Sequence, residues 1–202
     1  MAALGAEDLC PEIDLAMDAL APLRMPRADS DLCPIIVVDT REQTPLSFGR
    51  LASVVGTLTT GDYSFVGGQE LFAVERKTIQ DLVSCCTGEN RERFARELHR
   101  LRGFRFKRLL VIGSLEAIQA GHYPSKISPR SVLNTLSAFE MRFDVPVVFS
   151  PTPALAALTI ETWVWWFFRE MVKNLSGVCR AQDQGLPTNG RHVLGAGTQA
   201  VE

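Results

Sequence analysis

The fold is decided by the stretch Phe72-Ala73-Val74-Glu75-Arg76-Lys77-Thr78-Ile79-Gln80-Asp81-Leu82. It begins with the apolar pattern of a strand, ends that strand in charge and continues as a helix. Side chains two residues apart on a strand point to the same face, so Glu75 and Lys77 share one edge of the predicted sheet. A carboxylate near a core is costly unless it binds something, and a divalent metal ion with its water is a sensible occupant. An isolated Glu-x-Lys also fits a solvated salt bridge. Whether the pair is a metal site or a salt bridge is therefore judged from the other charged residues predicted near it.

Two further carboxylates are predicted at neighbouring strand ends. The run Pro34-Ile35-Ile36-Val37-Val38-Asp39 reads as a strand buried on both faces, with Asp39 where the sheet ends. Asp62 follows the turn residue Gly61 and opens a strand that pairs back, through Gly67-Gly68, onto the strand of Glu75. Three carboxylates offer hard oxygen ligands, which suit Mg²⁺ or Mn²⁺. Zinc is disfavoured because no suitable His or Cys lies near them in the sequence.

These residues form a motif that closely resembles the signature of the XPF-type structure-specific endonuclease domain, G-D-x(n)-E-R-K-x-x-x-D. Its fixed positions are occupied by Gly61, Asp62, Glu75, Arg76, Lys77 and Asp81. The resemblance includes the upstream run V-V-D-T-R-E that contains Asp39, and it covers about residues 35–173. It implies a restriction-endonuclease-like fold of the α/β class, with a mixed central sheet flanked by helices.

The resemblance also implies an activity. The chain is expected to be a Mg²⁺- or Mn²⁺-dependent DNA endonuclease that hydrolyses phosphodiester bonds in flap, fork or other branched DNA, in repair, recombination or a mobile element. The alternative is a catalytically silent nuclease-like scaffold that binds DNA or a catalytic partner subunit, since the family contains inactive subunits. Those subunits usually lose the signature acids, and this chain keeps them. Related enzymes usually carry a helix-hairpin-helix module after the nuclease, and the residues beyond 175 are too few for one, so the grip on DNA is expected from a partner or from dimerisation.

Each charged residue of the motif has an expected role. The predicted metal ligands are Asp39, Asp62 and Glu75, and the predicted catalytic residues are these three with Lys77, Arg76 and Asp81. Lys77 would steady the attacking hydroxide or the phosphate as a point charge. Arg76 points to the opposite face of the strand, where it pairs with Asp81 or touches a phosphate, and Asp81 either completes the site or braces Arg76. Glu42 is a candidate outer-shell ligand.

The distribution of charge favours a nucleic-acid partner despite a formal net charge of −2. Residues 1–33 hold seven acids and two bases, a net charge of −5, whereas residues 89–108 hold eight bases and three acids, a net charge of +5. Basic side chains contact DNA phosphates without reading the base sequence. The candidate DNA contacts are Arg41, Arg91, Arg93, Arg96 and Arg100. A solvated helix face is an equally open interpretation of the arginines after residue 89, because three glutamates are interspersed among them.

The pattern of elements predicts one nuclease domain with flanking segments. Strands and helices alternate after an early meander, which predicts a mixed sheet in an α/β layer architecture. Residues 1–33 are expected to be a flexible acidic leader, residues 34–175 the XPF-type nuclease domain, and residues 176–202 a disordered tail. Within the domain, residues 51–58 are predicted as a strand and residues 91–101 as an amphipathic helix. The five cysteines contain no C-x-x-C pair, which indicates an intracellular setting in cytoplasm, nucleoid or nucleus.

The last predicted helix, residues 153–175, is apolar on nearly all sides. Its large aromatic residues are Trp163, Trp165, Trp166, Phe167 and Phe168. Such a helix must be buried somewhere. Glu161 within it and Arg169-Glu170 after the aromatic residues disfavour a membrane span. Core packing is one interpretation, and the other is a homodimer or heterodimer interface through the late helices, which the family resemblance implies.

Overall fold

The computed structural model describes residues 32–183, which contain six strands and five helices in the predicted alternation. The strands are β1 (Ile36–Asp39), β2 (Ser53–Gly56), β3 (Tyr63–Phe65), β4 (Phe72–Thr78), β5 (Phe106–Ile112) and β6 (Val147–Ser150). The helices are α2 (Ile79–Ser84), α3 (Gly88–Leu101), α4 (Leu115–Gln119), α5 (Pro129–Phe143) and α6 (Pro153–Asp183). Residues 1–31 of the predicted leader and residues 184–202 of the predicted tail lie outside the described part of the chain.

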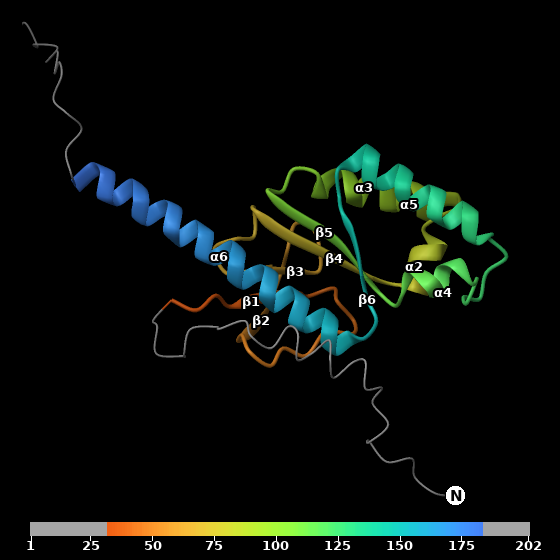
Figure 1. Cartoon of the computed structure of the whole chain (residues 1–202), viewed down its shortest axis with the longest axis horizontal. Coiled ribbons are helices and arrows are strands. Elements are labelled where there is room, and N and C mark those ends of the chain that lie inside the picture. The colour runs from red at the N-terminus through yellow and green to blue at the C-terminus, as the bar shows by residue number, and fades with distance from the viewer. Residues whose placement is uncertain (1–31, 184–202) are drawn as a thin grey trace, which may run out of the picture. The chain divides into compact units, whose positions relative to one another are not determined.

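The six strands form one mixed sheet in the order β2-β1-β3-β4-β5-β6, which confirms the predicted fold class (Figure 1). β3 pairs antiparallel with both β1 and β4, and the other neighbours are parallel. The ends of β1 and β4 and the start of β3 therefore meet at one edge of the sheet. β2 is four residues long and thus shorter than predicted, because the chain leaves the ladder on both sides of Ser53–Gly56.

The turn into β3 requires a glycine. Gly61 has a φ of 81°, and a Cβ at this position would lie 3.1 Å from the carbonyl oxygen of Val74 on β4. A side chain would therefore meet both backbone strain and a close contact. Because Gly61 has no side chain, the chain here packs closely on β4, and the N–H of Asp62 donates to the Val74 carbonyl (2.8 Å). The N–H of Asp39 in turn donates to the Asp62 carbonyl (2.9 Å). These two bonds fix the three acids across three adjacent strands.

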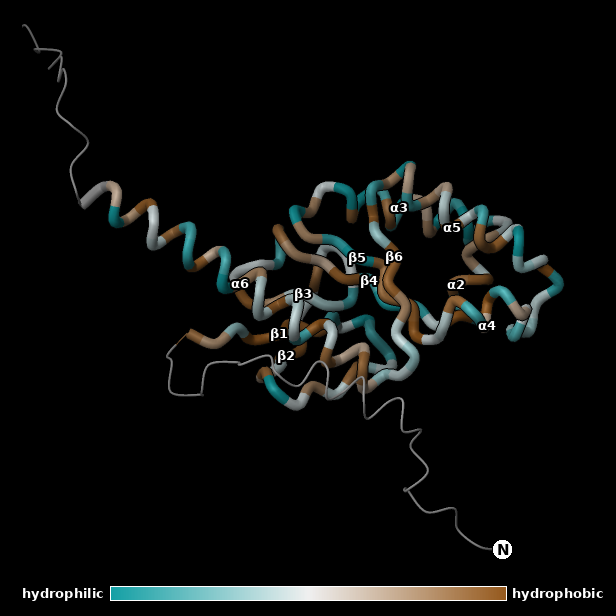
Figure 2. Tube along the Cα trace, in the orientation of Figure 1, coloured by the Kyte–Doolittle hydropathy of each residue, from teal (hydrophilic) through white to brown (hydrophobic). Residues whose placement is uncertain are grey.

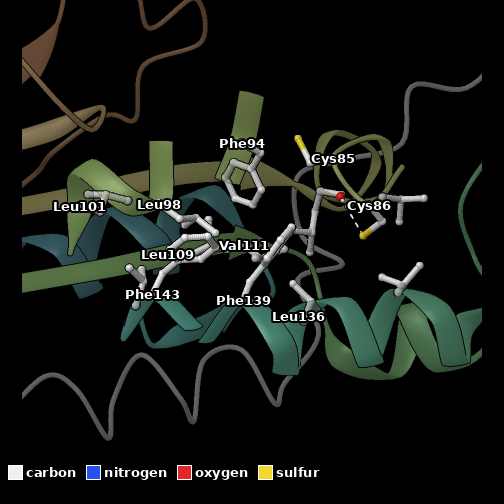
Figure 3. Packing of buried hydrophobic residues seen from close by; sticks show 14 of the residues in the cluster. Cys85, Cys86, Phe94, Leu98, Leu101, Leu109, Val111, Leu136, Phe139 and Phe143 are labelled. Carbon is white, nitrogen blue, oxygen red and sulfur yellow. Dashed lines mark hydrogen bonds between the residues drawn. The ribbon is translucent and has the colours of Figure 1, made fainter. Parts of the chain in front are cut away.

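One face of the sheet is covered by α2, α3, α4 and α5, and α3 and α5 lie side by side there (Figure 1). Hydrophobic residues are concentrated in the strands (Figure 2). In Figure 3, Phe94 of α3 and Phe139 of α5 face each other, and their ring centroids are 5.7 Å apart. The buried cluster also includes Leu98, Leu101, Leu109, Val111, Leu136, Phe143, Cys85 and Cys86. This packing holds α3 against the sheet beside the C-terminal half of β4.

The aromatic stretch of α6 packs on the opposite face of the sheet. Phe72 of β4 stacks on Phe106 of β5 at 4.4 Å, and Phe167 contacts both rings. Trp163 lies 5.6 Å from Phe106. Glu161 is also buried, and its Oε1 accepts hydrogen bonds from the backbone N–H groups of residues 50 (2.6 Å) and 51 (3.0 Å). Core packing thus accounts for much of this helix.

The chain divides into two compact units at residue 168. The described part of the second unit, residues 169–183, is the end of α6. Here the helix runs eight residues beyond the predicted end at Leu175, so residues 176–183 are helical and do not belong to a disordered tail. Within residues 32–183 no helix combines the length and the apolar character that a membrane span requires.

Candidate active site

A cleft of about 600 Å³ opens at the edge of the sheet where β1, β3 and β4 meet, and α2 and α3 form its other wall. Five acids and five bases line it, namely Glu42, Asp62, Glu75, Asp81, Glu97, Arg41, Arg76, Lys77, Arg93 and Arg100. Residues 41–44, just after β1, line part of the cleft. The rest of the lining comes from segments later in the chain, between residues 59 and 100. A cleft with carboxylates at its centre and cations around them suits a metal ion and a phosphate group together.

Glu75 and Lys77 lie side by side on β4, as the spacing predicts. Lys77 Nζ donates to Glu75 Oε1 at 2.5 Å, and it also lies 3.6 Å from Glu97 Oε2 on α3. Its ammonium group is 5.3 Å from the centroid of the Phe94 ring. Burial by itself would lower the pKa of Lys77, but the charge and hydrogen bond of Glu75 raise it above its ordinary value. Lys77 is therefore a fixed positive charge in this cleft at any physiological pH.

Asp62 lies beside Glu75 and carries an unusual pKa. Its Oδ2 accepts the backbone N–H of Arg76 at 2.7 Å, and this bond holds the carboxylate at the wall of the cleft. Burial, with the nearby negative charge of Glu75 as a second cause, raises the pKa of Asp62 to about 7. Burial also raises the pKa of Glu75, against the opposing effect of Lys77. Two adjacent carboxylates, one of them already paired with Lys77, form a site whose negative charge a divalent cation would offset.

The third predicted ligand, Asp39, is engaged by other groups. Its Oδ1 accepts the backbone N–H of Arg41 (2.9 Å) and Arg41 Nε–H (2.6 Å), and its Oδ2 accepts the N–H of Leu58 (2.7 Å). Burial alone would raise the pKa of Asp39, but these hydrogen bonds hold it below its ordinary value. Asp39 does not line the cleft. The role of Asp39 as a metal ligand stays a prediction, and across residues 32–183 no three acidic, His or Cys side chains are already gathered as a metal site.

Arg76 has a different partner from the one predicted. Its guanidinium donates to both carboxylate oxygens of Glu42, from Nε at 2.9 Å and from Nη2 at 2.8 Å, and Nη2 also donates to the hydroxyl of Thr44 at 2.6 Å. This bidentate pair is mostly buried, with 13% of the Arg76 side chain and 6% of the Glu42 side chain exposed. Glu42, predicted as an outer-shell ligand, thus braces Arg76, and Asp81 does not take that place.

Asp81 lies in the first turn of α2 and lines the cleft. Its Oδ2 accepts the hydroxyl of Thr78 at 2.7 Å, and its backbone N–H donates to the same hydroxyl oxygen at 3.1 Å. Thr78 is thus the N-cap residue of α2. Asp81 stabilises the start of the helix that carries it, and its carboxylate faces the cleft without contacting the Glu75–Lys77 pair.

The predicted DNA-contacting arginines fall into three groups. Arg93 and Arg100 line the cleft from α3, and Arg41 lines it from the other side. Arg96 is exposed and outside the lining. Arg91 is turned inward: its Nη1 donates to the Cys86 carbonyl (3.1 Å) and to the hydroxyl of Thr135 on α5 (2.9 Å), and its guanidinium is 5.0 Å from the Phe139 centroid. Arg91 is therefore a structural residue rather than a DNA contact.

Replacing Arg91 by Met is expected to lower the free energy of unfolding by about 1–3 kcal/mol, because the Thr135 hydroxyl and Cys86 carbonyl lose a charged donor. DNA affinity should stay unchanged. Urea denaturation and fluorescence anisotropy with labelled DNA measure the two quantities. Arg96→Met is the matched control and should leave stability unchanged, and a selective loss of DNA affinity in Arg91→Met would contradict this assignment.

Glu97 is a site residue that the sequence analysis did not single out. It lies on α3 between the two cleft arginines, 3.6 Å from Lys77 Nζ and 3.9 Å from Arg93 Nε. The only sequence signal was its helical spacing from Arg93 and Arg100, which places all three on one stripe of the helix. That spacing does not reveal which stripe faces β4.

Comparisons with known proteins identify a family and a similar fold. A family model described as the ERCC4 domain matches residues 38–162. The structure of XPF from Aeropyrum pernix is similar at 23% sequence identity and a TM-score of 0.52, over 65% of this chain and 60% of that chain. XPF from Aeropyrum pernix in complex with DNA is similar at 20% identity and a TM-score of 0.54, over 68% of this chain and 66% of that chain. The match thus spans less than two thirds of the length of either, and at these identities it shows the fold. A search of curated proteins gives no match.

Proposed function

The chain belongs to the ERCC4 domain family, and from this premise we propose that it is a metal-dependent endonuclease that cuts flap, fork or other branched DNA. The observation that carries the proposal is the single cleft in which Asp62, Glu75 and Lys77 meet. Two carboxylates suit a divalent metal ion and one lysine offsets charge on a phosphate, so the three groups fit metal-assisted phosphodiester hydrolysis. The bases at the rim of the cleft support a polyanionic substrate.

Asp62 and Glu75 are the residues that would hold Mg²⁺ or Mn²⁺. Their paired carboxylates supply hard oxygen ligands, and their raised pKa values indicate the cost of leaving both charges uncompensated. Asp39 would add a third ligand through the lone pair of its Oδ2 that Leu58 does not use, or through Oδ1 after the Arg41 side chain, which is 66% exposed, leaves it. When bound, the ion activates a water molecule and offsets charge on the phosphate.

The protein's own residues orient the substrate and balance its charge. Lys77, held between Glu75 and Glu97, places a fixed positive charge where negative charge builds up on the attacked phosphate. Arg93 and Arg100 follow the same wall of the cleft and would contact backbone phosphates on either side of the scissile bond. The backbone N–H of Arg76 keeps the Asp62 carboxylate in place.

DNA and a second nuclease-fold subunit are the proposed partners. One of the similar structures is an XPF in complex with DNA, which supports DNA as the ligand here. A homodimer or heterodimer through the late helices is supported by apolar surface on α5 and α6, where Met141 is 85% exposed and Trp166 46% exposed. Free cysteines at positions 33, 85, 86 and 179 are consistent with an intracellular location.

A second candidate function has one observation in its favour. Asp39 is occupied by Arg41 and Leu58, and an inactive scaffold that binds DNA or a catalytic subunit would tolerate this arrangement. A nicking assay separates the two. Wild type, Asp62→Ala and Glu75→Ala are incubated with end-labelled flap and fork DNA in Mg²⁺, in Mn²⁺ and in EDTA. Cutting by the wild type alone, and only with a metal ion, supports the endonuclease.

Two other outcomes of this assay would contradict the proposed endonuclease or its site. DNA binding without cutting in any metal favours the scaffold, with a partner subunit as the next component to add. Cutting that persists equally in both variants removes the proposed site from the reaction. Linear duplex of the same length is the substrate control, because the proposal requires branched DNA to be cut faster.

Replacing Glu97 by Gln is expected to lower kcat about tenfold, because Lys77 loses one of the two carboxylates that position it. DNA affinity should rise at the same time, since the change removes a negative charge from the cleft. A purely structural role would not move these two quantities in opposite directions. Single-turnover cleavage and anisotropy measure them, and Glu92→Gln, an exposed acid on the same helix, is the matched control. Equal losses in binding and cleavage would contradict the assigned role.

A further inference from the structure

A second pocket of about 280 Å³ lies next to the cleft. It is lined by Gln80, Val83, Ser84, Thr87, Asn90, Tyr123, Pro124, Ser125 and Ile127. The first residues come from α2 and the start of α3, and the last four from the loop between α4 and α5. The proposed reaction gives none of these residues a role. Ser84 also lines the cleft, so the two hollows share one residue.

The shared residue makes the two hollows neighbours across α2. Gln80, Val83 and Ser84 have the spacing of one face of α2, and Thr87, the N-cap of α3, continues this wall of the second pocket. Asp81, Ser84 and Cys85 of the same segment border the cleft. Ser84 thus lies between the cleft and the second pocket.

The chemistry of the second pocket differs sharply from that of the cleft. Ten of the residues that line the cleft are charged, and none that lines the second pocket is. Within residues 32–183, no hydrogen bond engages the side-chain amide of Gln80 or of Asn90, and the Thr87 hydroxyl makes no cap hydrogen bond to α3. These groups are available to donate to and accept from a ligand. A phosphate would gain no cationic partner here, whereas a neutral polar ring would find both donors and acceptors.

The loop wall is held in place by its own hydrogen bonds. The Tyr123 hydroxyl donates to the Ile127 carbonyl at 2.9 Å, and the Ile127 N–H donates to Ser125 Oγ at 3.3 Å. Tyr123 is only partly exposed, and Pro124 follows it. The Tyr123 side chain is held by its hydroxyl bond and by packing against the core, so little conformational entropy is lost when a base packs on it.

We propose that this pocket binds one unpaired nucleobase of the DNA strand, adjacent to the phosphate in the cleft. The inference rests on the proposed function and specifies its substrate: a nucleotide in a duplex cannot turn its base into the pocket without unpairing, so DNA with an unpaired nucleotide at the cut is preferred. The amides of Gln80 and Asn90 read the edge of the base, and Tyr123 packs on its face. The volume suits one base and is below that of a drug-sized ligand site.

The test uses binding rather than cleavage. Flap DNA carrying 2-aminopurine at single positions across the junction is titrated with the full chain in EDTA, and the fluorescence of each position is recorded. One unpaired position should change on binding. The double variant with Gln80→Ala and Asn90→Ala should lose that change and bind the flap about fivefold more weakly. It should bind fully paired duplex as well as the wild type does.

Two controls separate this site from other effects. Asn134→Ala replaces an exposed amide on α5 outside the pocket and should behave as wild type. An abasic nucleotide at the responsive position should weaken binding by the wild type and have no further effect on the double variant. Flap binding without any position-dependent signal, or a signal that the double variant retains, overturns the base pocket alone. Absence of DNA binding by the wild type overturns the proposed function as well.

Discussion

Asp62→Asn is expected to abolish DNA cleavage while making the folded protein more stable at neutral pH. The loss of cleavage should reach about a thousandfold, because the variant loses one of two carboxylates that would hold the metal ion. The gain in stability has an independent cause. Burial and the charge of Glu75 raise the pKa of Asp62 to about 7, so the ionised carboxylate is unfavourable in the folded state. The amide of the variant removes this charge and still accepts the N–H of Arg76.

The pH dependence of this stability difference has a definite sign. The unfolded chain releases the Asp62 proton near the ordinary pKa of 3.8, whereas the folded protein keeps it until about pH 7. The Asp62 carboxyl therefore costs the wild type stability as pH rises between these values, and the amide of Asp62→Asn has no such effect. The difference in unfolding free energy should be near zero at about pH 4 and level off above about pH 7 at about 2–4 kcal/mol.

Urea denaturation in EDTA at several pH values measures this difference, and Glu92→Gln controls for removal of an acid at an exposed position. Mg²⁺ provides a second readout that needs no activity: it should raise the melting temperature of the wild type and not that of Asp62→Asn, because a ligand stabilises only the state that binds it. A variant less stable than wild type at about pH 8 would contradict the raised pKa of Asp62, and equal stabilisation of both proteins by Mg²⁺ would remove Asp62 from the metal site.

Arg76→Met is expected to cause the largest loss of stability in the cleft. The substitution leaves the Glu42 carboxylate, whose side chain is 6% exposed, without its bidentate partner. Breaking one side of a buried ion pair costs about 3 kcal/mol or more, because the remaining charge is buried and unpaired. Thr44 loses a hydrogen bond as well. Unfolding in urea should show the full loss at neutral pH.

A double-mutant cycle identifies the cause of that loss. Adding Glu42→Gln to Arg76→Met removes the stranded charge and should restore at least about 1 kcal/mol, a clear departure from additivity. Arg100→Met, in the same cleft but exposed, should change the unfolding free energy by less than about 0.5 kcal/mol. Strict additivity of the two cleft substitutions would mean that Glu42 and Arg76 do not stabilise each other.

Local patterns account for the parts of the fold that were predicted well. The apolar run ending at Asp39, the glycine turns around the β3–β4 hairpin and the Thr78 cap of α2 depend on neighbours within a few residues. The bounds of β2 were predicted less well, since an edge strand ends where its single partner ends. The end of α6 lies past Leu175, because the apolar pattern used to bound the helix stops there and does not mark where the helix itself ends.

By itself, the sequence determined the nuclease family, the mixed sheet and the shared face of Glu75 and Lys77. The family follows from a fixed motif, the mixed sheet from the alternation of strands and helices after an early meander, and the shared face from the two-residue period of a strand. All three are patterns along the chain. Only the tertiary structure decided the partners of the charges. Arg76 pairs with Glu42, 34 residues away, Arg91 turns inward to Thr135, 44 residues away, and Glu97 of α3 reaches Lys77 of β4. Such pairings depend on which distant segments pack together, and the hydrophobic periodicity of the sequence does not predict that packing.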